Sequence, residues 1–95
     1  MTDPDHVDLP KSVTLGDIQA KIKKTYYHVV PDTTLTICVL TLENGFNVTA
    51  TSACVHPAKF SKAVGEQIAY NNAVEKIWEL EGYLLSQRRF EAHLA

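Results

Sequence analysis

The spacing of hydrophobic and polar residues changes once along this chain. Between residues 25 and 52 they alternate, as in β-strands, whereas beyond Pro57 apolar residues return every three or four positions, as on one face of a helix. The helical stripe consists of Val64, Ile68, Ala73, Ile77, Leu80 and Leu84. The pattern predicts a sheet followed by one long helix from about residue 61, with a candidate bend where Gly82 interrupts the stripe.

Three strands are predicted, over TYYHVV (25–30), TLTICVLTL (34–42) and FNVTATSA (46–53). The middle segment has apolar residues on both faces, which is typical of a central strand covered on both sides. Pro31 and Asp32 end the first strand. Asn44 and Gly45 separate the second from the third and predict a type I′ hairpin turn, because both residues tolerate positive φ. The result is a three-stranded antiparallel meander.

A short helix is predicted before the sheet, because Leu15, Ile18 and Ile22 recur at helical spacing. Thr14, with Asp17 three residues later, resembles a capping box. Residues 1–12 are polar and aperiodic, so we expect a mobile tail or a clasp against a partner subunit. The predicted fold over residues 13–95 is a single α+β domain with a short N-terminal helix, a three-stranded antiparallel meander and a long C-terminal helix packed on the sheet.

Composition narrows the classes of function. The 95 residues carry a net charge of −2, which argues against a dedicated DNA binder with a basic stripe. No apolar stretch is long enough to cross a membrane. Cys38 and Cys54 fit no metal spacing, so we expect no metal site and two free thiols in a reducing cytoplasm. A chain this small is also expected to form a homo-oligomer, a dimer or a multiple of one.

Catalytic residues are not evident in the sequence. Cys54 and His56 lie two positions apart and are candidates for a nucleophile and its base, but no third group that would orient them is apparent. The sequence has neither a glycine-rich phosphate loop nor a metal signature. We therefore expect a binding protein, without catalytic residues or cofactors, rather than an enzyme.

Five side chains are candidates for ligand binding. Phe60, at the junction of sheet and helix, either staples the start of the helix or stacks on a flat ligand. Asn71 and Asn72 are poor helix formers in mid-helix, where an amide either satisfies backbone groups or reads a base edge or a ribose. Arg88 and Arg89 either favour the helix dipole or bind phosphate through the planar guanidinium group.

The spacing of Asn72 and Arg89 limits how they could act together. They are about five helical turns apart, so both could lie along one helical face, yet on a straight helix they would be about 25 Å from each other. One nucleotide cannot span that distance. Either the helix bends at Gly82, or the arginine that completes a pocket comes from a second subunit.

The stretch from NGF (44–46) to LEGYLL (80–85) resembles the small phage-protein family named after phages N4 and Sf6. The shared pattern is an NGF strand, a SACV-x-PA-x-F junction, G-x-x-x-A-x-x-x-A and W-x-LEGYLL, and with TICVLTL it covers about residues 25–90. Family members usually have Asp before the junction proline and often Pro after the tryptophan. This chain has His56 and Glu79 there, and the second difference favours a more continuous helix.

A second resemblance concerns function. The order of strands, junction phenylalanine, mid-helix asparagine and late arginine is similar to the first class of Thoeris anti-defence proteins. These are phage sponges that sequester cyclic ADP-ribose isomers made by bacterial TIR enzymes, and some also hold cyclic oligonucleotides. The resemblance implies that Phe60 stacks on adenine, Asn71 or Asn72 contacts the ligand, and Arg88 or Arg89 holds phosphate. It also implies a site of action in the cytoplasm of the infected bacterial host.

Two other classes of function stay open. The first is a protein–protein interaction module, whose helix packs as a dimer and whose strand edge or tail binds a host protein without a small ligand. The second, weaker alternative is a DNA-associated phage protein. A cyclic nucleotide should stabilise a sponge against heat and leave an interaction module unchanged.

Overall fold

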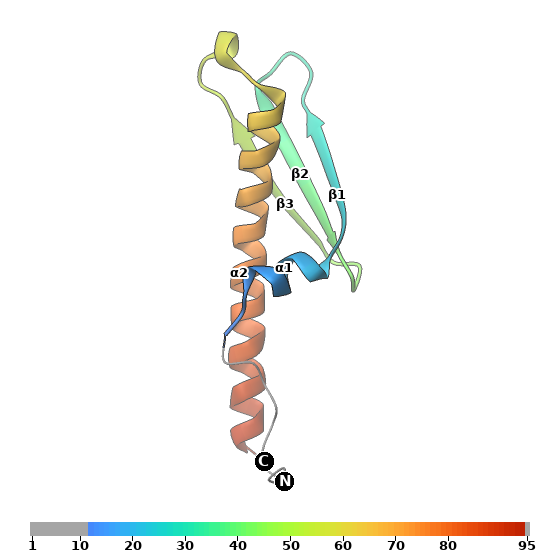
Figure 1. The fold of residues 1–95 in the computed structure, drawn as a ribbon, viewed down its shortest axis with the longest axis vertical. Helices are drawn as coiled ribbons and strands as arrows, with labels where there is room; N and C mark the ends of the chain where they lie inside the picture. Colours follow the sequence, from blue (N-terminus) through green and yellow to red (C-terminus); the bar gives the residue numbers. More distant parts are fainter. Residues whose placement is uncertain (1–11, 95) are drawn as a thin grey trace.

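The computed structural model describes residues 12–94 and shows the predicted succession of elements (Figure 1). These are α1 (Leu15–Lys21), β1 (Ile22–Val29), β2 (Leu35–Leu42), β3 (Asn47–Ala53), the 3-10 turn η1 (Pro57–Lys59) and α2 (Lys62–Leu94). The α+β fold with a short first helix and a long last helix is thereby confirmed. The predicted tail, residues 1–12, lies outside the described residues except for Ser12.

The three strands form one antiparallel sheet in the order β1-β2-β3, and α2 packs across one face of it (Figure 1). Alternate residues of β2 point toward the helix and are buried, because side chains of a strand alternate between its two faces. They meet the small and aliphatic side chains of α2. The core consists of Ile18, Cys38, Leu40, Leu42, Val48, Ala50, Ala69, Ala73, Val74 and Ile77.

The opposite face of the sheet has no covering layer within the described chain. Leu35, Ile37 and Val39 lie on this face and are only half-buried. The prediction that β2 is covered on both sides is therefore wrong for the single chain. The reason is that α1 is only seven residues long and packs against α2 and the start of β1, so it adds no second layer.

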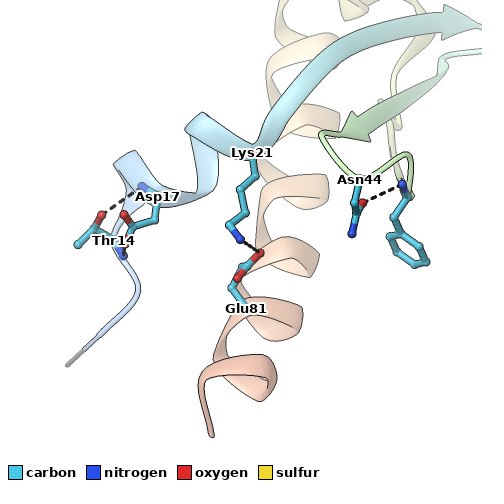
Figure 2. Close-up of polar contacts among 6 residues, drawn as sticks. Thr14, Asp17, Lys21, Asn44 and Glu81 are labelled. Atoms are coloured by element: carbon cyan, nitrogen blue, oxygen red, sulfur yellow. Dashed lines mark hydrogen bonds and ion pairs between the residues drawn. The ribbon is translucent and has the colours of Figure 1, made fainter. Parts of the chain in front are cut away.

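The capping box at the start of α1 is confirmed. The Asp17 amide donates to Oγ1 of Thr14 over 3.2 Å, and the Thr14 amide donates to Oδ2 of Asp17 over 2.9 Å (Figure 2). The helix is shorter than the apolar spacing predicted, because Ile22 ends it with extended backbone angles and pairs with Leu42 in the sheet. The predicted assignment of Ile22 to the helix is wrong.

The turn between β2 and β3 differs from the predicted type I′ hairpin. Gly45 has φ of 88°, but the only described non-glycine residue with positive φ is Asp32, so Asn44 has negative φ. The Gly45 amide donates to the Leu42 oxygen and the Leu42 amide to the Phe46 oxygen. These bonds close a three-residue loop in which one left-handed residue is enough. Asn44 instead accepts a hydrogen bond from the Phe46 amide through Oδ1 (Figure 2).

The long helix α2 is continuous over its 33 residues and does not break at Gly82, so the predicted bend is wrong (Figure 1). Its length is about 50 Å, whereas an eight-residue strand spans about 26 Å. The C-terminal part of α2 therefore extends beyond the sheet, where Phe90 is 58% exposed. No described helix combines the length and the apolar character needed to cross a bilayer.

Two side chains of α2 donate hydrogen bonds to backbone oxygens at the outer edge of β3. The Asn72 amide nitrogen donates to the backbone oxygen of Thr51 over 3.0 Å. One helical turn later, the Lys76 ammonium donates to the backbone oxygen of Thr49 over 2.5 Å. Carbonyl groups at the edge of a sheet lack a neighbouring strand. Here α2 supplies the donors for two of them.

Candidate functional site

Two of the five predicted ligand-binding residues lie at one cavity, which we name the junction cavity. It has a volume of about 430 Å³ and lies between the end of β3, η1 and the first turns of α2, where Phe60 and Asn72 both line it. Small-molecule sites typically fall in the range of about 300–1,000 Å³. The cavity is therefore large enough for part of a nucleotide.

Phe60 reaches the cavity because of the way η1 leads into α2. Pro57 begins η1, and the Phe60 amide closes this turn by donating to the Pro57 oxygen over 3.1 Å. Ser61 then accepts from the Val64 amide through Oγ and from the Gly65 amide through its backbone oxygen. The Phe60 ring also packs against Gly65. The ring thus lies against the start of α2, and both the stapling role and stacking on a ligand stay predictions.

The start of α2 gives the junction cavity a positive character. No acidic residue lies in the first turn of α2, so the partial positive charge of the helix N-terminus is not offset there. Lys59 lines the cavity next to Phe60, and Ser61 lies beside it. Sequence analysis did not select Lys59 as a ligand residue. The signal that could have identified it is a lysine and an aromatic side by side just before a helix.

The two asparagines have different surroundings. Asn72 lines the junction cavity and donates through Nδ2 to the backbone oxygen of Thr51, so its amide does satisfy a backbone group. Its Oδ1 remains available as an acceptor. Asn71 is exposed and accepts a hydrogen bond from Gln67 over 2.9 Å, and it does not line the cavity. The structure therefore favours Asn72 over Asn71 as the residue at the site.

Arg88 lies at a second cavity of about 320 Å³, next to α1. Its charged lining consists of two cations, Lys21 and Arg88, and three carboxylates, Asp17, Glu43 and Glu81. Figure 2 shows Lys21 reaching from α1 to Glu81 of α2, with 3.1 Å between Nζ and Oε1. Because carboxylates outnumber cations here, this cavity is poorly suited to a phosphate group.

The structure does not bring the arginines to Phe60 and Asn72 within one chain. At about 100° per residue, Arg88 lies roughly 160° around α2 from Asn72, and exposed Arg89 roughly 100° around it. The prediction that Asn72 and Arg89 lie along one helical face is therefore wrong. Since α2 is continuous, a bend cannot join the two regions either. Only an arginine from a second copy could complete the junction cavity.

The cysteines and histidines show no arrangement typical of nucleophilic catalysis in the described chain. Both cysteines are free. The Cys54 thiol donates to the backbone oxygen of His56 over 3.2 Å, so a carbonyl engages its hydrogen. Burial raises the pKa of the Cys38 thiol, which keeps it protonated at neutral pH. Among residues 12–94, no three or more His, Cys, Asp or Glu side chains cluster as a metal site would require.

The comparisons with known proteins identify a family. No curated protein and no solved structure matches this chain. Residues 13–89 match the phage protein family of N4 Gp49 and phage Sf6 gene 66. The match runs from α1 into the last turns of α2, and it confirms the resemblance found in the NGF, SACV and LEGYLL blocks. The chain belongs to the N4 Gp49/phage Sf6 gene 66 family of phage proteins.

Proposed function

We propose that this phage protein binds a cyclic nucleotide immune signal and sequesters it without cleaving it, in the cytoplasm of the infected host. The signal would be a cyclic ADP-ribose isomer or a cyclic oligonucleotide, as in the first class of Thoeris anti-defence proteins. The observation that carries this proposal is the convergence of Phe60, Lys59 and Asn72 on one cavity at the N-terminus of a long helix.

Each part of that cavity suits a different part of a nucleotide. The Phe60 ring offers a face on which a base can stack, worth about 1–3 kcal/mol for base–aromatic contacts to single strands. Lys59 and the amide groups at the start of α2 favour a phosphate, because both are positive. Asn72 presents Oδ1 to the ligand. A sponge needs such affinity and no turnover.

The proposal needs an arginine from a second copy of the chain. In an antiparallel pair of α2 helices with a two-fold axis near Leu80, Arg88 of one copy would lie at the same height along the helix axes as Asn72 of the other. Near that axis Leu80 is 45% and Tyr83 70% exposed, so apolar area is available for pairing. We therefore propose a homodimer, or a multiple of one, in which Arg88 or Arg89 reaches the partner's junction cavity.

The direct test is isothermal titration calorimetry of the full chain against a panel of cyclic ADP-ribose isomers and cyclic oligonucleotides. We expect binding to at least one of them, and recovery of that compound unchanged after the protein is denatured. At a hundredfold excess of ligand over Kd, the unfolding free energy should rise by about 2.7 kcal/mol. Chemical alteration of the recovered compound would contradict sequestration.

A matched pair of variants separates stacking from packing. Phe60→Leu keeps an apolar side chain against Gly65 and removes the aromatic face, so it should weaken binding about tenfold or more. Phe46→Leu changes an exposed phenylalanine in the β2–β3 turn, away from the junction cavity, and should leave affinity unchanged. Equal affinity of the Phe60→Leu and wild-type proteins would leave Phe60 as a staple only.

One observation favours the alternative of an interaction module. Phe46, Leu80 and Tyr83 line an open groove of about 510 Å³ between β3 and α2, and all three are exposed. Apolar patches of this kind often contact proteins. No response to any compound of the panel, together with loss of a host-protein complex on Tyr83→Ser, would support this function instead.

A further inference from the structure

Another cavity lies against the junction cavity, and we name it the loop cavity. It has a volume of about 440 Å³ and lies between the β1–β2 turn, which contributes Asp32, and the segment that leads from β3 into η1. Three residues line both cavities, namely Thr34, Cys54 and Phe60. A ligand that stacks on Phe60 therefore borders the loop cavity as well as the junction cavity.

The two cavities differ in charge. Among the described residues, Lys59 is the charged residue that lines the junction cavity, and Asp32 is the charged residue that lines the loop cavity. The Asp32 carboxylate forms no hydrogen bond or ion pair within residues 12–94. Asp32 has φ of 62°, a conformation that asparagine also tolerates. The turn therefore does not require the charge, which remains available to a ligand.

The other polar side chains of the loop cavity also act as acceptors. Thr33 Oγ1 donates to the Val30 oxygen over 2.8 Å, and Thr34 Oγ1 donates to the Cys54 oxygen over 2.6 Å. The Cys54 thiol donates to the His56 oxygen over 3.2 Å. The remaining described residues of the lining have apolar side chains. Because a hydroxyl or a thiol has a single hydrogen, the side chains of this cavity offer a ligand acceptors.

We infer that the loop cavity binds ribose hydroxyl groups of the ligand through the Asp32 carboxylate, so that the protein selects a ribonucleotide over its deoxy and phosphorylated forms. The inference rests on the proposed function, in which the ligand is a nucleotide. With the base on Phe60 and the phosphate near Lys59, the hydroxyl edge of the ribose is left for the loop cavity. A hydroxyl group supplies the hydrogen that these acceptors need, and an acidic side chain binds the ribose 2′-hydroxyl in the same way in dinucleotide sites.

A phosphate group in place of a ribose hydroxyl is disfavoured for two reasons. An ionised phosphate has no hydrogen to donate to the acceptors of the loop cavity, and its negative charge is repelled by the Asp32 carboxylate. Water and salt screen this repulsion, because Asp32 is exposed. We therefore expect a several-fold preference rather than complete exclusion.

Paired ligands test the inference on the wild-type protein. Cyclic di-AMP is compared with its 2′-deoxy form, and cyclic ADP-ribose with its 2′-deoxy and 2′-phosphate forms. If another compound of the panel binds instead, the form that lacks its free ribose hydroxyl is used. The parent compound should bind about three- to tenfold more tightly than the deoxy form, as expected for one hydrogen bond, and the phosphate form should bind least. Equal or tighter binding of the modified forms overturns the inference and leaves sequestration intact, whereas no binding by any compound of the panel overturns both.

Asp32→Asn tests the assignment, because it keeps a residue suited to the left-handed turn and removes the charge. It should lower the ratio of affinities between the parent and deoxy forms, and it should weaken the discrimination against the phosphate form most. Glu43→Gln is the matched control, since Glu43 is an exposed carboxylate at the other end of β2 and does not line the loop cavity. The control should keep both ratios, and melting curves confirm that both variants fold. Unchanged ratios in Asp32→Asn, or the same change in both variants, would overturn the role of Asp32.

Discussion

Gly65 of α2 lies so close to β2 that a Cβ atom added to it would be 2.7 Å from Oγ1 of Thr36. Thr36 is fully buried, and its hydroxyl has no hydrogen-bond partner in the described part of the chain. Helix and sheet can approach this closely because residue 65 is a glycine and has no side chain. Gly65 also lines the junction cavity, together with Ser52 and Phe60.

We expect Gly65→Ala to lower the free energy of unfolding by about 1–3 kcal/mol, because a methyl group forced into a packed interface displaces helix and sheet. Gly82→Ala is the matched control. Gly82 lies in the same helix with nothing within 4 Å of an added Cβ, so this change should raise stability by about 0.5–1 kcal/mol. Urea denaturation measures both. Similar effects of the two substitutions would contradict the close approach.

Lys59→Gln should weaken nucleotide binding and make the remaining affinity less sensitive to salt. The reason is that Lys59 is the lysine that lines the junction cavity, and the attraction of its ammonium group for a phosphate is screened by salt. Lys62→Gln is its control, because Lys62 begins α2 and does not line the cavity. Titrations at two ionic strengths compare the variants. If both substitutions weaken binding equally, the general positive charge near the N-terminus of α2 attracts the ligand, and Lys59 makes no specific contact with it.

A pocket shared between two copies predicts complementation between inactive variants. A chain with Phe60→Leu and a chain with both Arg88→Ala and Arg89→Ala should each bind poorly alone. When the two are mixed and allowed to exchange, half of the dimers are mixed and each has one intact pocket, so about a quarter of the sites should recover. Binding that is not restored in a mixture of exchanging dimers would place every ligand contact in one chain.

The capping box of α1 predicts a specific dependence on pH. Hydrogen bonds from the amide and hydroxyl of Thr14 hold the pKa of Asp17 below its ordinary value of 3.8. A carboxyl group whose pKa is lowered by folding stabilises the protein above the unfolded pKa, and this contribution is lost as the pH falls through the folded pKa. The advantage of wild type over Asp17→Asn should thus be present at pH 6 and decline as the pH falls below 3.8.

Chemical denaturation across this pH range measures the effect. Asparagine still accepts the hydrogen bonds of the capping box but does not titrate, so it isolates the charge. In a Thr14→Ala background the side chain that also lowers the pKa of Asp17 is absent while the bond from the amide of residue 14 remains, so the pH dependence of the Asp17→Asn difference should become smaller. A difference that is constant from pH 6 to pH 2.5 would contradict the lowered pKa.

The elements of this fold follow from local patterns in the sequence. Alternation, helical spacing and the Thr14–Asp17 pair identify α1, the three strands and α2 in their observed order. The incorrect predictions arise where hydrogen bonds between paired strands determine the local conformation. The loop around Asn44 and Gly45 is set by the bond between Leu42 and Phe46, so a turn type inferred from two residues was wrong.

The candidate site could be predicted only in part. Phe60 and Asn72 stand out as residue types in unusual places, and the structure brings them to one cavity. Arg88 was a candidate for the same site as Asn72, but it lines another cavity. Such relationships depend on three-dimensional packing, which spacing alone does not reveal.

The bonds from Asn72 and Lys76 to the oxygens of β3 also limit how copies of this protein can aggregate. A sheet with two free edges can add further molecules at both ends and grow into a fibre. Here side chains of the protein's own helix satisfy two backbone oxygens on the β3 edge, and Lys23 and Lys24 are exposed on β1. Both features disfavour the addition of a further strand, so we expect little edge-to-edge growth.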